Sequence, residues 1–188
     1  MTRNTRQQIR RSIRYYQQRG SVTLDRAEDV AQALDWLDAL EVLHTKYWNN
    51  RGKSGAFSNP SFKSFHRNLI STSFADGVPD LLQLRAGDTV LGYLYNFRWR
   101  GVGYSYQSGF LYEQDTQARP GLVAHALAMQ KYRTEGISTY NFLAGESRYK
   151  SSLSTGKDEL LWIVARRPRL PRWLIKAAGI CVPQFFAS

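Results

Sequence analysis

The sequence predicts a mixed α/β domain in which helices cover both faces of a central, mostly antiparallel sheet. Two local patterns and the composition indicate this fold class. Between residues 81 and 112, three strand-like segments follow one another through short turns, as in an antiparallel meander. A helical segment and a further strand come next, which places a helix on the sheet. The chain has 188 residues, is 43% hydrophobic and 13% aromatic, and so has enough apolar surface for one core.

Residues 1–20 are expected to form a basic amphipathic helix that ends at Gly20. This segment contains six arginines and no acidic residue, and Ile9 and Ile13 recur at helical spacing. Residues 21–25 alternate apolar and polar side chains, which predicts a short strand after the helix.

The next segments predict two helices joined by a loop. Residues 27–49 give the clearest helical pattern, because leucines recur along one face. Residues 49–59 are rich in Gly, Ser and Asn, as loops are, and Pro60 suits the first position of the second helix. Gly77 and Pro79 are expected to end that helix.

The meander is predicted to contain strands over 81–84, 90–99 and 102–112. Gly87 and Gly101 mark the turns, and short turns make neighbouring strands antiparallel. The alternation of side chains along a strand predicts a shared face for four residues of the third strand. These residues are Tyr104, Tyr106, Ser108 and Phe110.

The remaining elements begin with a helix from Pro120 to about Glu135, which Gly136 caps. They continue with a buried strand over 137–143, a short helix or loop over 145–154, a strand over 160–165 and a short helix over 171–178.

Some classes of site are excluded by the composition. Cys181 is the only cysteine, which rules out an internal disulfide and fits a reducing compartment. His44, His66 and His125 lack the spacing of metal ligands, so we expect no metal. The sequence has no apolar signal-peptide core near its start and no long apolar run. We therefore expect a cytoplasmic protein without a transmembrane helix.

The formal net charge of +11 favours anionic partners. A phosphorylated cofactor, nucleic acid and an anionic membrane surface all fit this charge, as does a role in solubility alone. The tail over residues 168–188 combines arginines with Trp173, Phe185 and Phe186. This combination predicts peripheral contact with the inner face of the membrane as one alternative.

Several motifs then narrow the fold class. His44 and Trp48 form a His-x-x-x-Trp element, and Pro120-Gly121 opens a helix after a tyrosine-rich strand. A Tyr-Asn-Phe-Leu-Ala-Gly-Glu stretch over 140–146 precedes a Tyr-Lys pair. In this order, over about residues 10–166, the motifs resemble the acyltransferase domain of the GNAT superfamily, in its FemAB-like/CelD-like branch.

This resemblance implies a GNAT-like domain over 21–167, between the helix over 1–20 and the tail over 168–188. It implies N-acyl transfer from acyl-CoA, with an acetyl or longer acyl group, to a small-molecule amine. The amine would attack the thioester directly, and a backbone N–H on the third meander strand would stabilise the oxyanion.

The resemblance also implies a phosphate site where the helix at Pro120 begins. A helix N-terminus offers unpaired N–H groups to the cofactor pyrophosphate, here with Arg119, Gly121 and Leu122. The local residues alone favour an ordinary loop before a helix, and it is the matching order of the strands that puts the phosphate site on an equal footing. Lys150 is expected to hold a phosphate or carboxylate.

Tyr149 is the predicted proton donor to the leaving thiolate, and Glu146 is the weaker candidate for the base. A surface Tyr-Lys pair and a carboxylate that complements a helix dipole are the structural alternatives. The residues expected to shape the acceptor site are His44, Trp48, Tyr104, Tyr106, Gln107 and Asn141.

Each acceptor-site residue also has a purely structural alternative. A buried core histidine and ordinary sheet aromatics are common. Asn141 stands where the family usually has Asp, and an amide cannot act as a base.

The family commonly carries two such domains in tandem, and this chain resembles the second. A homodimer or a separate N-terminal half-domain is therefore an expected partner. The alternatives are a non-catalytic binding or regulatory half-domain and an aminoacyl-tRNA-dependent transferase, for which the partner would be tRNA.

Overall fold

The computed structural model describes residues 1–145, 147–159, 161 and 163. The chain divides into two units, Met1–Gly156 and Lys157–Ser188. The strand expected over 160–165 falls largely outside the described residues, and the helix over 171–178 and the tail fall wholly outside them. The elements of the first unit are α1 (Arg3–Gln17), β1 (Val22–Arg26), α2 (Val30–Asn49), η1 (Ala56–Ser58), α3 (Pro60–Ser73), β2 (Pro79–Ala86), β3 (Thr89–Trp99), β4 (Val102–Phe110), α4 (Pro120–Thr134), β5 (Thr139–Asn141) and α5 (Arg148–Leu153).

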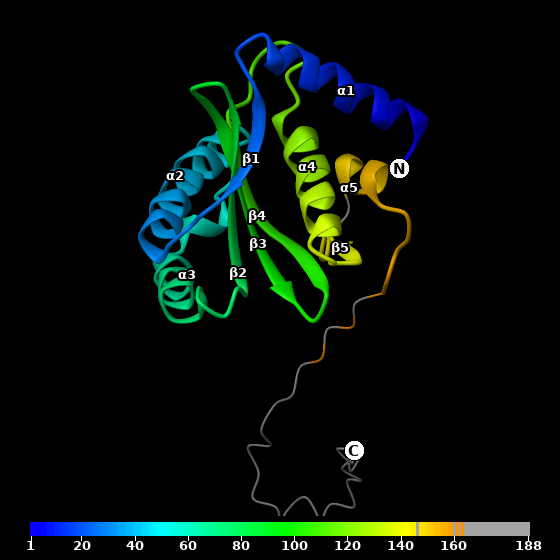
Figure 1. Cartoon of the computed structure of the whole chain (residues 1–188). Coiled ribbons are helices and arrows are strands. Elements are labelled where there is room, and N and C mark those ends of the chain that lie inside the picture. The colour runs from blue at the N-terminus through cyan, green and yellow to red at the C-terminus, as the bar shows by residue number, and fades with distance from the viewer. Residues whose placement is uncertain (146, 160, 162, 164–188) are drawn as a thin grey trace, which may run out of the picture. The chain divides into compact units, whose positions relative to one another are not determined.

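The five strands form one mixed sheet in the order β1-β2-β3-β4-β5 (Figure 1). The first four strands pair antiparallel, and β5 pairs parallel to β4. The predicted meander is therefore confirmed. The helix α4 connects β4 to β5, because parallel neighbours need a crossover.

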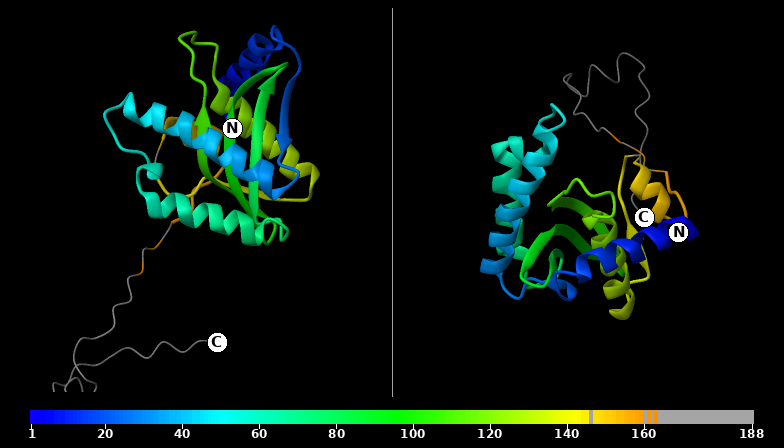
Figure 2. Two further views of the ribbon diagram at one scale, coloured as in Figure 1. Left: turned by 90° about the vertical axis from the view of Figure 1, so that its left-hand side faces the viewer. Right: turned by 90° about the horizontal axis from the view of Figure 1, so that it is seen from above.

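Two apolar cores lie on opposite faces of the sheet. Leu81 packs with Leu37 of α2 and Ile70 of α3. The next residue, Leu82, packs with α1 and α4, because successive side chains of a strand point to opposite faces. Figures 1 and 2 show α2 and α3 on one side of the sheet and α4 on the other. Helices on both faces were predicted, and the structure confirms them.

The helix boundaries follow from local chemistry. The side chain of Asp29 accepts a hydrogen bond from the Gln32 N–H, so α2 begins at Val30 and not at residue 27. Pro60 and Pro120 each stand at the start of a helix, as predicted.

The shared face predicted for the third meander strand is wrong. Tyr95 of β3 opposes Gln107 and Asn96 opposes Ser105, so Tyr106 is an extra residue in a β-bulge. The bulge shifts the alternation by one residue. Tyr106 therefore packs with the α2–α3 core, whereas Phe110 packs with the α4 core.

Candidate functional site

The strands β4 and β5 stay paired over only three residues. The last pair joins Tyr104 to Asn141, while β4 continues to Phe110. The Asn141 Oδ1 atom accepts the Leu143 N–H at 2.7 Å, and Leu143 has a φ of 57°. This turn ends β5 earlier than the predicted 137–143. Asn141 is therefore the last residue of β5 and holds the turn that follows. Beyond Tyr104, the edge of β4 that faces away from β3 has no strand partner in the described part of the chain.

The start of α4 lies beside this free edge. Gly121 packs on the Phe110 ring, where a Cβ would lie 3.3 Å from the ring. The Arg119 N–H donates to Ser12 Oγ at 3.0 Å, and the Val123 N–H donates to the Arg119 carbonyl. Among the described residues, no acceptor is recorded for the N–H groups of Gly121 and Leu122. These two N–H groups make the helix start a candidate anion site.

The helix α1 holds the loop that precedes α4. The Arg11 Nε donates to Gln117 Oε1 at 3.0 Å, and the Arg19 guanidinium forms an ion pair with Glu113. Arg119 Nη1 donates to Gln8 Oε1 at 2.9 Å, so the guanidinium is tied to α1. Sequence reasoning missed this contact, because partners about 100 positions apart leave no local pattern.

Tyr149 of α5 lies at the same end of β4. Its ring stacks on His125 with centroids 5.3 Å apart and planes 9° apart, and its edge meets Phe142. Burial raises the pKa of Tyr149, and the nearby Tyr47 adds to the rise. The phenol therefore stays protonated at neutral pH, as a proton donor must.

Lys150 turns towards the backbone. Its Nζ donates to the Ala144 carbonyl at 2.7 Å, so the ammonium holds the turn after β5. Burial lowers the pKa of Lys150. Glu146, the candidate base, lies outside the described residues.

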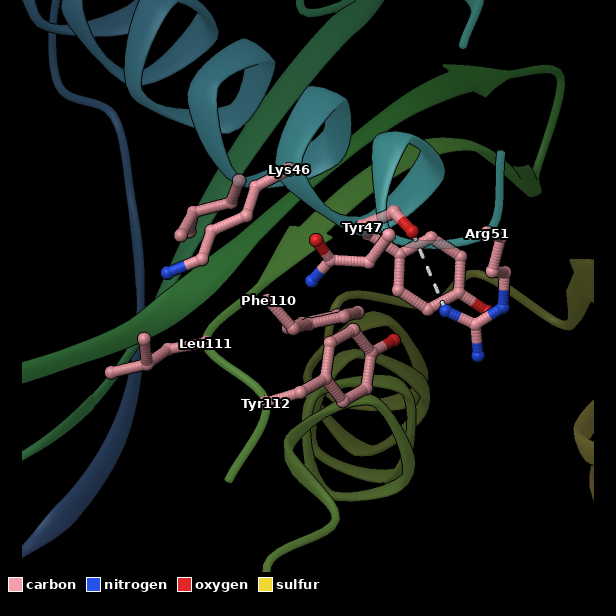
Figure 3. A pocket seen from close by; sticks show the side chains of 8 residues that line it. Lys46, Tyr47, Arg51, Phe110, Leu111 and Tyr112 are labelled. Atoms are coloured by element: carbon pink, nitrogen blue, oxygen red, sulfur yellow. Dashed lines mark hydrogen bonds between the residues drawn. The ribbon is translucent and has the colours of Figure 1, made fainter. Parts of the chain in front are cut away.

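A pocket of about 230 Å³ opens where α2 ends against the end of β4 (Figure 3). The Tyr47 and Tyr112 rings lie 5.1 Å apart, and the Arg51 guanidinium lies 3.7 Å from the centre of the Tyr47 ring. Tyr112 is 53% exposed, and partial desolvation of its hydroxyl raises its pKa to about 12, with a contribution from the nearby Tyr47. The lining residues are Leu43, Lys46, Tyr47, Asn50, Arg51, Phe110, Leu111 and Tyr112.

None of these eight residues was among the sequence-predicted site residues. The sequence signal that was available is the spacing of Leu43 and Tyr47, which places both on one side of α2, with Arg51 four residues further on in the turn after the helix.

His44 and Trp48 lie together but do not line this pocket. His44 is buried, and its Nδ1–H donates to the Ser108 carbonyl of β4 at 3.1 Å. A Cβ on Gly55 would lie 2.8 Å from His44 Nε2 and 2.9 Å from Trp48 Cδ1, so only glycine fits there. Burial lowers the pKa of His44, which keeps the ring neutral. In this structure the pair joins α2 to β4.

Tyr106 joins β4 to α3. Its hydroxyl lies 3.1 Å from Nε2 of the buried His66, whose Nδ1 lies 3.2 Å from the Tyr95 hydroxyl. Tyr104 and Gln107 stand on either side of the bulge in β4. The bulge thus brings Tyr106 to the α3 side, and the structure does not group it with Tyr149.

A buried polar chain runs beneath α4. His125 Nδ1 lies 2.9 Å from the Tyr140 hydroxyl, and Asn96 Nδ2 donates to the hydroxyls of Tyr140 and Tyr132. Tyr132 in turn donates to Asp80 at 2.6 Å. The chain fixes His125, and His125 fixes the ring of Tyr149.

Acidification is expected to destabilise the protein between pH 7 and 5. Burial lowers the pKa of His125 to about 3 and also lowers the pKa of His44 and His66. Unfolded histidine has a pKa of about 6.5. The unfolded state therefore binds protons that the folded state does not, and each such histidine lowers stability by up to about 1.4 kcal/mol per pH unit.

Urea unfolding at several pH values measures this slope. In the His125→Phe variant, the free energy of unfolding should change less steeply with pH, by the equivalent of about one bound proton, whatever the absolute stability of the variant. An unchanged slope would mean that His125 is protonated in the folded protein.

Two absences are limited to the described residues. Across residues 1–145, 147–159, 161 and 163, the His, Cys, Asp and Glu side chains form no group of three or more suited to a metal ion. None of the helices in that part of the chain has both the length and the hydropathy that a membrane span requires.

A bulged fourth strand, a parallel fifth strand that soon leaves it, and a helix that starts between them define a GNAT-type domain. The family model described as "Acetyltransferase (GNAT) domain" matches residues 3–151. The chain therefore belongs to this family.

Solved structures share the fold. One is an aminoglycoside acetyltransferase from an uncultured soil metagenomic sample, with a TM-score of 0.51 and 12% identity over 78% of this chain and 97% of that chain. Another is a possible acetyltransferase from Clostridium difficile 630, with a TM-score of 0.52 and 11% identity over 78% and 99% of the two chains. A comparison with curated proteins finds no match.

Proposed function

We propose that this protein is an N-acyltransferase of the FemAB-like/CelD-like branch that uses acyl-CoA and an amine acceptor. One observation carries the proposal. In a GNAT domain, the start of α4 presents two N–H groups without a recorded acceptor beside the unpaired edge of β4. Such a helix start binds phosphate, and an unpaired strand edge binds an extended amide chain.

The described residues fit the two parts of an acyl-CoA. The N–H groups of Gly121 and Leu122 would hold its pyrophosphate, with Arg119 at the edge of the same turn. The amide-containing arm would follow the free edge of β4 towards Tyr149.

The reaction forms a C–N bond and breaks the C–S bond of the thioester. A base, for which Glu146 is the candidate, removes a proton from the attacking amine. An N–H of β4 stabilises the oxyanion, and Tyr149 donates its proton to the departing thiolate. Tyr149 suits this role because a tyrosine phenol is protonated at neutral pH and because His125 and Phe142 hold its ring.

Calorimetric titration with acetyl-CoA and a longer acyl-CoA tests the proposal. We expect saturable binding that the Arg119→Ala/Gly121→Asp double variant loses, since a carboxylate at the helix start repels phosphate. The matched control is Arg133→Ala/Gly156→Asp. Arg133 lies at the other end of α4, and a Cβ on Gly156 meets nothing within 4 Å.

No binding by a folded protein would contradict the proposal and favour a phosphate-rich polymer as the partner. Four exposed arginines at helical intervals on α1 support that alternative, because none of them forms an ion pair with a described acid. They are Arg3, Arg6, Arg10 and Arg14. Binding to RNA that weakens steeply with salt would then identify the aminoacyl-tRNA-dependent class.

A further inference from the structure

The pocket at the end of α2 is positively charged. Lys46 and Arg51 both line it, and no acidic side chain does. No ion pair between either residue and an acid is recorded among the described residues. The acid one turn before on α2, Glu41, pairs with Lys63 at 2.7 Å, so its charge is already matched.

On the β4 side of the pocket, the acidic residue nearest in sequence to the lining residues is Glu113, and its charge is also matched by a basic residue. Glu113 follows Tyr112 directly and forms its ion pair with Arg19, two residues after the end of α1. Arg51 Nη1 donates to the Tyr47 carbonyl at 3.5 Å, and neither Arg51 nor Lys46 has its charge matched by an acid that lines the pocket. The other N–H groups of Arg51, the Lys46 ammonium and the side-chain amide of Asn50 therefore remain as donors for a ligand.

The rest of the pocket is apolar and aromatic. Figure 3 shows the Tyr47 and Tyr112 rings beside Phe110, with the Arg51 guanidinium next to Tyr47. A volume of about 230 Å³ corresponds to roughly eight waters at ~30 Å³ each. A compact anionic head with a short apolar or planar body fits this space.

The pocket adjoins the proposed proton donor. Phe110 lines the pocket, its ring centroid lies 6.4 Å from that of His125, and Tyr149 stacks on the same His125 ring. A ligand in the pocket therefore lies beside the reacting thioester of the proposed reaction.

We propose that this pocket binds a carboxylate or phosphate group of the acceptor substrate, with Lys46 and Arg51 as the residues that select for it. The proposal rests on the proposed acyl transfer. It assigns the acceptor to the class of amines that carry an anionic group, such as amino acids and phosphorylated amines. The planar guanidinium of Arg51 matches the two oxygens of such a group.

The test uses matched pairs of acceptors that differ in the anionic group. Calorimetry measures the binding of L-phenylalanine against phenethylamine, and of O-phosphoethanolamine against ethanolamine, with and without CoA present. We expect the anionic member of at least one pair to bind tenfold or more tightly. The Lys46→Gln/Arg51→Gln variant should lose this preference, and the Arg100→Gln/Arg133→Gln control, with the same change of charge, should keep it.

The results that would contradict this assignment can be told apart from one another. Equal binding within both pairs, no binding of any of the four compounds, or a preference that survives in Lys46→Gln/Arg51→Gln would overturn the assignment. If that variant loses affinity for acyl-CoA and keeps the acceptor preference, the pocket binds a phosphate of CoA and the acceptor assignment is wrong. Failure of the proposed function shows separately, as the absence of acyl-CoA binding by the wild-type protein.

Discussion

The Tyr149→Phe variant is expected to lower kcat for acyl transfer by about 10²- to 10⁴-fold while acyl-CoA affinity changes little. The phenol supplies the proton that the thiolate needs as it departs. Phenylalanine keeps the stacking on His125 and the edge contact with Phe142, so the fold and the cofactor site should persist. Release of free CoA with a saturating amine measures kcat, and calorimetry measures the affinity.

A matched control distinguishes the loss of proton donation by Tyr149 from the general effect of removing a tyrosine hydroxyl. Tyr15→Phe removes a partly buried hydroxyl of α1 that donates to Glu113 in the loop after β4, and it should leave kcat near the wild-type value. The Tyr149→Phe defect should shrink with an acyl donor whose thiol has a lower pKa, because that thiolate leaves without a proton. Full turnover by Tyr149→Phe would remove the residue from the mechanism.

The Asp80→Ala variant is expected to lower the free energy of unfolding by about 3–5 kcal/mol. Asp80 is 1% exposed, accepts from the Arg26 guanidinium, and accepts from the Tyr132 hydroxyl at 2.6 Å. Alanine leaves the Tyr132 hydroxyl buried without its acceptor. Glu135 retains part of the pairing with Arg26 and Arg98, which limits the loss.

Urea unfolding measures the effect, and Asp25→Ala is the control. Asp25 is exposed, bonds only to Thr23 in the described structure, and should cost less than about 0.5 kcal/mol. A loss of less than about 1 kcal/mol in Asp80→Ala would show that the polar chain beneath α4 adds little to stability.

The sequence predicted the elements that depend on neighbouring residues. Pro60 and Pro120 fix the starts of α3 and α4, because their φ angles and missing N–H groups suit only the first turn of a helix. The turns at Gly87 and Gly101 separate the meander strands as predicted. The same local signals placed Arg119 and Gly121 at a helix start, which the structure confirms.

The sequence did not predict the bulge or the early end of β5. Tyr106 leaves the shared face because the extra residue depends on the pairing with β3, and no pattern within β4 shows it. Asn141 ends β5 through a hydrogen bond to Leu143, and an Asn inside a strand-like stretch gives no sign of that turn.

The sequence by itself therefore determined the order of the elements, the family motifs and the helix start that suits a phosphate. The tertiary structure decided which side chains meet. It brought Tyr47 of α2 against Tyr112 of the loop after β4, it stacked Tyr149 of α5 on His125, and it turned the His44 ring to the Ser108 carbonyl and out of the pocket lining. The physical reason is the sequence distance over which each interaction acts. Helix and strand propensities and helix caps act between residues within one or two helical turns of each other. Tertiary contacts join residues up to 111 positions apart, and these contacts form only in the folded chain.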